Sequence, residues 1–179
     1  MNVFQAFNNG LAVGFIAAFL AGIAHSQLPL RARSASFVLF GIFLCLIRLK
    51  IFLDDHKYFQ TAATRTRHFK IGFVVGVISW ILWGLAALFI GSLEDSYFLA
   101  GTAILVSSIW IAVVAIRSGA YREQYVWFGT NAAYVLLLWA LYRRNGEEGD
   151  WVTWSLLGAL LGVLLFDWIK SDSVPELAQ

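Results

Sequence analysis

Residues 36–53 read SFVLFGIFLCLIRLKIFL, an apolar run whose only charges, Arg48 and Lys50, lie near its end. About 20 apolar residues in a helix cross the hydrocarbon core of a bilayer. This run therefore predicts a membrane-spanning helix, and similar runs recur along the chain. We place six predicted spans at about 4–24, 36–53, 71–93, 97–116, 125–142 and 151–169.

The composition favours the same class of protein. The chain has 179 residues, of which 60% are hydrophobic and 13% charged, whereas soluble domains carry about 25% charged residues. The expected fold is all-α: a polytopic integral membrane protein with a bundle of six antiparallel transmembrane helices. The segments between spans are too short for a second domain, so residues 1–179 form one domain. Its net charge of +2 is too small to indicate nucleic acid binding.

The distribution of basic residues predicts the orientation. No Lys or Arg precedes the first apolar run, so it lacks the positive region of a cleavable signal and is expected to be a true first helix. Basic residues mark the cytoplasmic side. We therefore expect both termini in the cytoplasm, at the inner membrane of a bacterium. The basic residues on that side are Arg48, Lys50, Lys57, Arg65, Arg67, Lys70, Arg117, Arg122 and Lys170, against Arg31, Arg33, Arg143 and Arg144 on the other.

The longest polar stretch, from about Asp54 to Lys70, joins the second and third spans. Lys50 and Asp54 are four residues apart, which favours a second helix that continues beyond the membrane surface. The other connections are short, so the helices that they join are expected to be antiparallel neighbours. We call the stretch from about Asp54 to Lys70 the elbow, and it is the candidate surface for a partner protein. Its candidate contact residues are Asp54, Asp55, Lys57, Arg65 and Arg67.

Small residues recur at helical spacing in two spans. Such stripes allow helix backbones to approach closely in lipid. Two interpretations stay open: packing within the bundle, or a face for self-association that makes a homo-oligomer. The residues are Gly10, Gly14, Ala18 and Gly22 in the first span, and Gly158 and Gly162 in the sixth.

Three tryptophans fall near the middle of predicted spans rather than at the ends, where indole rings usually anchor. These are Trp80, Trp83 and Trp110. A buried indole N–H needs an acceptor. The rings either pack in the core or line an apolar ligand pocket or gate, together with Asn131 and Tyr134.

Ionisable residues inside membrane spans are functional candidates by default. Arg48 and Lys50 lie at the cytoplasmic end of the second span, and Asp167 lies near that end of the sixth. Either base is at a suitable depth to pair with Asp167, while Lys170 is a local partner three residues away. The alternative is that both bases extend to the interface without any function.

Metal sites and catalytic centres are not predicted. The three histidines, His25, His56 and His68, lie outside the predicted spans, and no HExxH or phosphate-binding glycine loop occurs. We therefore expect no metal, no cofactor and no enzymatic activity.

The segment 47–116 resembles a known family. It places Arg48 at the end of a span, then a polar elbow with Tyr58 and Arg65, then Phe69 before a helix containing Trp83 and Gly84. This order is similar to the MASE-type six-helix membrane input regions that precede diguanylate cyclase and histidine kinase domains. The resemblance implies a membrane sensor that passes a signal through its last helix. Residues 170–179 contain no coiled coil or output domain, so the output would belong to another polypeptide.

Three functions follow from these patterns, in order of preference. The first is a non-enzymatic membrane sensor or accessory signalling subunit that acts through a partner at its cytoplasmic face. The second is a homo-oligomeric channel, which the small-residue stripes favour. The third is a carrier for a small apolar or aromatic solute held by the central tryptophans.

Overall fold

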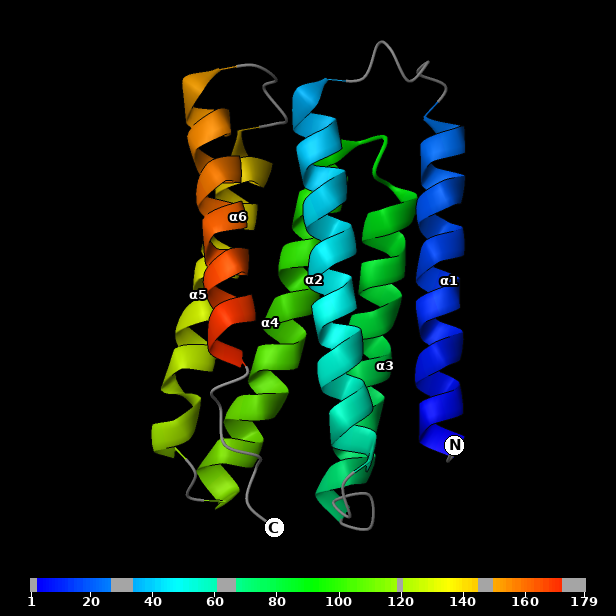
Figure 1. Cartoon of the computed structure of the whole chain (residues 1–179), viewed down its shortest axis with the longest axis vertical. Helices are drawn as coiled ribbons and strands as arrows, with labels where there is room; N and C mark the ends of the chain where they lie inside the picture. The colour runs from blue at the N-terminus through cyan, green and yellow to red at the C-terminus, as the bar shows by residue number, and fades with distance from the viewer. Residues whose placement is uncertain (1–2, 27–33, 61–66, 119–120, 145–149, 172–179) are drawn as a thin grey trace.

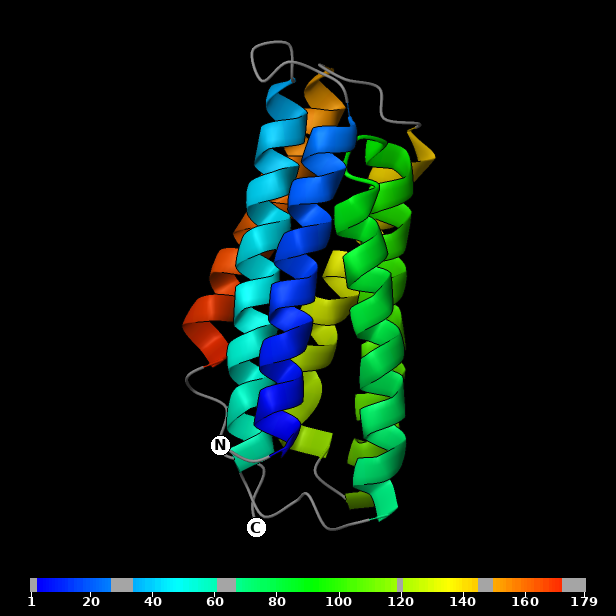
Figure 2. The same ribbon diagram turned by 90° about the vertical axis from the view of Figure 1, so that its right-hand side faces the viewer.

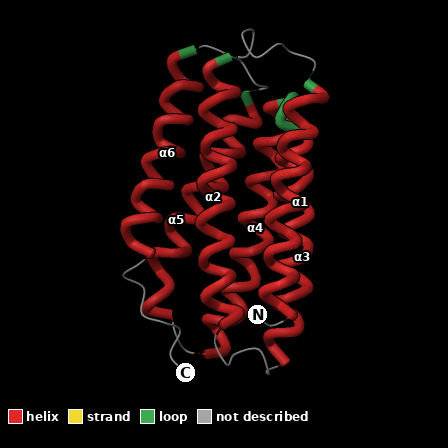
Figure 3. The backbone as a smooth tube through the Cα atoms, turned by 45° about the vertical axis from the view of Figure 1, so that its right-hand side comes forward, coloured by secondary structure: helices red, strands yellow, loops and turns green. Residues whose placement is uncertain are grey.

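The computed structural model describes residues 3–26, 34–60, 67–118, 121–144 and 150–171, and these form six helices and no strand (Figure 3). The all-α prediction is confirmed, and α2 continues to Gln60, beyond the predicted span, as the Lys50–Asp54 spacing favours. The helices are α1 Val3–His25, α2 Ala35–Gln60, α3 Arg67–Leu88, α4 Leu93–Ser118, α5 Tyr121–Arg143 and α6 Trp151–Ser171.

The helices form a closed ring in which each one packs mainly against two others. Around the ring the order is α1, α2, α6, α5, α4, α3 and back to α1. The helices joined by short connections are antiparallel neighbours, as predicted. Two further neighbour pairs, α1 with α3 and α2 with α6, run in the same direction (Figure 1). The ring therefore brings the last helix against the second.

Capping residues explain where several helices begin. Ser34 accepts a hydrogen bond from the backbone N–H of Phe37 at the start of α2. The predicted span 71–93 runs too far at its end: α3 stops at Leu88, and the hydroxyl of Ser92 donates to Asp95 where α4 begins. Hydropathy placed this turn a few residues too late because the residues around it, Phe89, Ile90 and Leu93, are apolar. Ser92 is the sequence signal, since serine is a preferred N-cap.

The centre of the ring is filled by aromatic side chains from α2. The ring of Phe40 meets Tyr97 of α4 edge-on, with centroids 4.4 Å apart, and the ring of Phe43 lies 5.9 Å from Tyr134 of α5. Both phenylalanines and Trp83 of α3 are fully buried. Aromatic pairs in this range add about 0.5–1.5 kcal/mol beyond the area they bury. The described side chains thus pack the middle of the ring rather than line an open path.

The outer surface of the ring is apolar. Val13, Leu136, Leu165 and Ile169 are each more than 60% exposed on three different helices. Among the described residues, three helical segments are long and apolar enough to cross a membrane: Gln5–His25, Ala35–Asp54 and Trp151–Lys170. Apolar side chains that point outward around such helices indicate contact with a lipid bilayer.

Asp150 caps α6 and supplies a pH-dependent prediction. Its carboxylate accepts the backbone N–H of Thr153 at 2.7 Å, and this bond, together with Arg144, holds the pKa of Asp150 below its ordinary 3.8. A carboxylate whose pKa is lowered by folding stabilises the fold above pH 3.8. This stabilisation is lost as the pH falls through the lowered pKa. We expect Asp150→Ala to melt at a lower temperature than wild type at pH 6. The difference should shrink below pH 3.8, as thermal melts in detergent at both pH values would measure.

Candidate functional site

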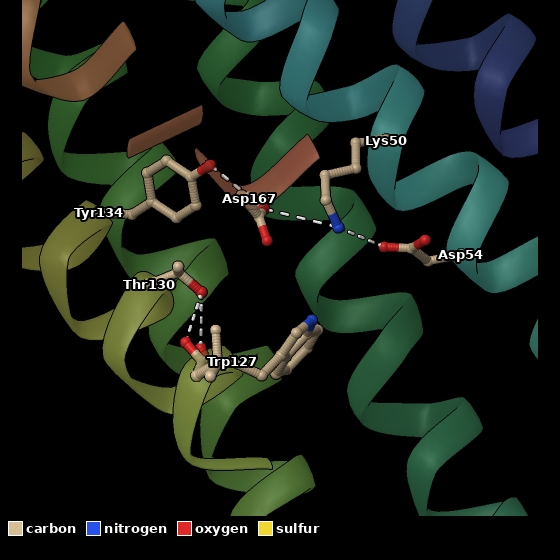
Figure 4. Close-up of polar contacts among 7 residues, drawn as sticks. Lys50, Asp54, Trp127, Thr130, Tyr134 and Asp167 are labelled. Atoms are coloured by element: carbon tan, nitrogen blue, oxygen red, sulfur yellow. Dashed lines mark hydrogen bonds and ion pairs between the residues drawn. The ribbon is translucent and has the colours of Figure 1, made fainter. Parts of the chain in front are cut away.

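Lys50 is the centre of a buried group of polar side chains between α2, α5 and α6. Its side chain is only 5% exposed. Its ammonium nitrogen lies 2.7 Å from a carboxylate oxygen of Asp54 and 3.5 Å from one of Asp167 on α6 (Figure 4). Of the partners left open for Asp167, Lys50 is therefore observed in contact with it, across two helices and 117 positions of sequence.

Tyr134 brings α5 into the same group. Its hydroxyl donates a hydrogen bond to the same oxygen of Asp167 at 3.2 Å, and the residue is 1% exposed. Thr130, one turn earlier, bonds instead to the carbonyl of Trp127 in its own helix (Figure 4). We call Lys50, Asp54, Tyr134 and Asp167 the Lys50 cluster.

The Lys50 cluster reaches toward water on one side only. The side chain of Asp54 is 36% exposed, whereas that of Asp167 is 11% exposed. Burying an ion pair costs several kcal/mol per ion in desolvation, which is offset only when both charges keep close partners. Each charged group of this cluster has such a partner, so three helices can bury the cluster together.

Arg48 points away from Lys50 and enters a different environment. Two residues along a helix turn by about 200°, so these neighbouring bases face opposite sides of α2. The guanidinium carbon of Arg48 lies 3.4 Å from the ring centroid of Trp80, and the rings of Phe15 and Trp83 lie further out, at 5.8 and 5.7 Å. A desolvated cation–π contact contributes about 2 kcal/mol. Arg48 therefore joins α2 to α1 and α3.

The low exposure of Arg48 and Lys50 argues against the alternative that their side chains extend to the membrane interface. Arg48 is 3% exposed and Lys50 is 4% exposed in the isolated chain. A side chain that extends along the protein surface keeps its charged end in water. The surrounding helices cover both charged ends instead.

Asn8 is a buried polar residue that the sequence analysis did not single out. It is fully buried on α1, and its amide donates to the backbone carbonyl of Phe52 on α2 at 3.3 Å. The available signal was an asparagine in a long apolar segment, where a polar group needs an internal partner.

Among the described side chains, the candidate gate residues do not form one group. Trp80 stacks on Arg48, Trp83 is fully buried in the core, and Tyr134 belongs to the Lys50 cluster. Asn131 is partly buried on α5, and the side chain of Trp110 lies outside the described side chains. The hydroxyl of Ser79, one residue before Trp80, donates to the carbonyl of Ala103 and accepts from Ser107.

The small residues divide into two kinds. Gly22 is buried where α1 crosses α3, and an added Cβ would lie under 3.0 Å from the backbone carbonyl groups of Ala87 and Leu88. Ala18 also packs partly against the core. The other four have nothing within 4 Å of an added Cβ, and they are Gly10, Gly14, Gly158 and Gly162. Only the end of the first stripe therefore serves packing within the bundle.

Of the elbow candidates, the structure places only Asp54 in detail. Asp55 and Lys57 belong to the last turns of α2, and Arg67 begins α3, but their side chains are outside the described ones. Arg65 lies outside the described residues. Among the residues that are described, no three His, Cys, Asp or Glu side chains gather in a way that would hold a metal ion.

Comparisons with known proteins assign no family to this chain. No protein-family profile, curated protein or solved structure matches the chain.

Proposed function

We propose that this chain is a non-enzymatic signal-input or accessory subunit of a membrane complex, acting through a partner protein at its cytoplasmic face. In this proposal all six helices cross the bacterial inner membrane, with both termini in the cytoplasm. Each helix has 21 to 26 residues, and about 20 residues are enough to span the hydrocarbon core. Helices α3, α4 and α5 share the ring with the three more apolar helices, so neighbours shield part of their surface.

The observation that carries the proposal is the Lys50 cluster. It links α6, the last helix, to α2, and α2 continues for six residues beyond Asp54. Buried charges are expensive in a membrane and are found mostly where a protein acts. The cluster thus supports a bundle whose second and last helices communicate.

The basic residues of the elbow provide a test of partner binding. The double variant Arg65→Glu, Arg67→Glu is expected to lose about tenfold or more of the co-purifying partner, because rim charges of one sign steer and orient association. The measurement is the native mass of the complex extracted in mild detergent from its own membrane. A second polypeptide added to multiples of the 20.0 kDa chain is the expected result.

Arg143→Glu serves as the matched control, because Arg143 is exposed at the other end of the bundle. It should leave the mass of the complex unchanged. If the double variant retained the partner as well as wild type does, the elbow would not be the binding surface. A mass that is a multiple of 20.0 kDa alone would contradict the whole proposal.

A homo-oligomeric channel is the second candidate, and one observation favours it. Gly10 and Gly14 on α1, and Gly158 and Gly162 on α6, present open backbone on the outside of the ring. Such positions suit close helix contact between copies. Because aromatic side chains fill the centre of the ring, any path for ions would run between protomers. The carrier hypothesis is weaker, because Trp80 is already covered by Arg48.

A further inference from the structure

Asp167 makes polar contacts that join the end of α6 to two other helices. Asp167 lies one turn before the helix ends at Ser171, and its carboxylate contacts both Lys50 of α2 and Tyr134 of α5. Beyond it, Ile169 is 65% exposed. In Figure 1, α6 ends well short of the lower ends of α2 and α4, and in Figure 2 its end leans outward from the bundle. Asp167 therefore joins the most peripheral part of α6 to its neighbours.

The Lys50–Asp167 contact is also the longer of two that Lys50 makes. The distance to Asp54, in the same helix, is 2.7 Å, and the distance to Asp167 is 3.5 Å. If α6 moved away, Lys50 would keep Asp54 as its counter-charge. Asp167 would move with its helix toward more exposed surroundings. Separation of a buried pair is strongly unfavourable when it leaves a charge uncompensated, and here the lysine is never left alone.

We propose that Lys50 is an exchangeable latch: it holds the end of α6 against α2 through Asp167, and it transfers fully to Asp54 when α6 swings outward. The three helices then have two defined arrangements, closed with Lys50 shared and open with Lys50 held by Asp54. A bistable element of this kind is what a signal requires in order to bias a structure. The role of the latch in signalling rests on the proposed function, whereas its opening is a property of the purified chain.

Distances between spin labels on α2 and α6 test the latch directly. The full chain would carry Cys45→Ser, which removes its single cysteine, with labels at Leu46→Cys and Ile169→Cys, both on exposed positions. In Asp167→Asn the lysine loses one carboxylate and retains Asp54. We expect a second population with a label distance longer by on the order of 5 Å, because helices that stop packing move beyond their usual axis separation.

Two further variants make the result specific. Asp54→Asn leaves Asp167 as the only carboxylate of the cluster, so a single short distance is expected. Asp150→Asn is the matched control: it makes the same chemical change at the other end of α6 and should reproduce the wild-type distribution. An unchanged distribution in Asp167→Asn, equal to that of Asp150→Asn, would overturn the latch.

Folding of the variants is checked by helix content and by elution as a single species in detergent. If Asp167→Asn aggregates, Asp167→Ala replaces it, since this change also removes the carboxylate that Lys50 contacts on α6. A longer second population is again expected, and a single unchanged distance refutes the latch. The measurement needs no partner. A latch that opens in the purified chain, combined with a native mass that is a multiple of 20.0 kDa alone, would leave the latch standing and the proposed function refuted.

Discussion

Replacing Lys50 with methionine is expected to destabilise the folded bundle by about 3–5 kcal/mol, because it leaves the buried carboxylate of Asp167 without a counter-charge. The side chain of Asp167 is 11% exposed, and its remaining contact in the cluster is the hydroxyl of Tyr134. This differs from opening of the latch, in which Lys50 stays in the protein. The free energy of unfolding is measured by titrating the detergent-solubilised protein with a denaturing detergent and following tryptophan fluorescence.

Lys170→Met is the matched control for this change. Lys170 lies on α6, one turn after Asp167, and is exposed, so its loss should cost less than about 1 kcal/mol. The double variant Lys50→Met, Asp167→Leu should recover most of the stability, because apolar pairs can replace buried ion pairs. A loss below 1 kcal/mol for Lys50→Met alone would mean that water reaches Asp167 and that the cluster is not truly buried.

Gly22→Ala is expected to destabilise the bundle by about 3 kcal/mol, near the upper end of the range for overpacked cores. The added methyl would lie under 3.0 Å from the backbone of Ala87 and Leu88 on α3. Backbone atoms inside a helix cannot rotate away as a side chain can. The two parallel helices α1 and α3 must therefore separate at this level, which the same unfolding titration would detect.

Gly14→Ala makes the identical change two turns earlier in α1. Nothing lies within 4 Å of its added Cβ, and alanine favours the helix over glycine by up to about 1 kcal/mol. We expect this variant to be as stable as wild type or slightly more stable. If both alanine variants behaved alike, α1 would not be seated on α3 as described. A loss in Gly14→Ala alone would indicate that this open face packs against another molecule.

Local features of the structure were accessible from the sequence. The apolar runs predicted the helices because a long apolar segment in lipid must satisfy its backbone internally. Lys50 and Asp54 were predictable as a pair because four residues bring side chains together on any helix. The opposite directions of Arg48 and Lys50 follow equally from helical geometry. The aromatic surroundings of Arg48 do not, because they come from α1 and α3.

Contacts between helices that are far apart in the sequence could be learned only from the structure. Asp167 has a basic residue three positions away, yet the described contact is with Lys50, because the ring places α6 beside α2. Likewise, Gly10, Gly14 and Gly22 look equivalent in the sequence, and only Gly22 meets a neighbouring backbone. Periodicity identifies a face of a helix but not the helix that it faces.

The sequence by itself determined that this chain is helical and suited to a bilayer, because hydropathy and helical spacing act over a few turns. Only the tertiary structure decided the order of the ring, the parallel pairs α1 with α3 and α2 with α6, and the meeting of Lys50, Tyr134 and Asp167. The physical reason is that apolar helices in lipid gain little from hydrophobic burial against one another. Their partners are chosen by shape and by a few polar contacts, which no single segment of the chain contains.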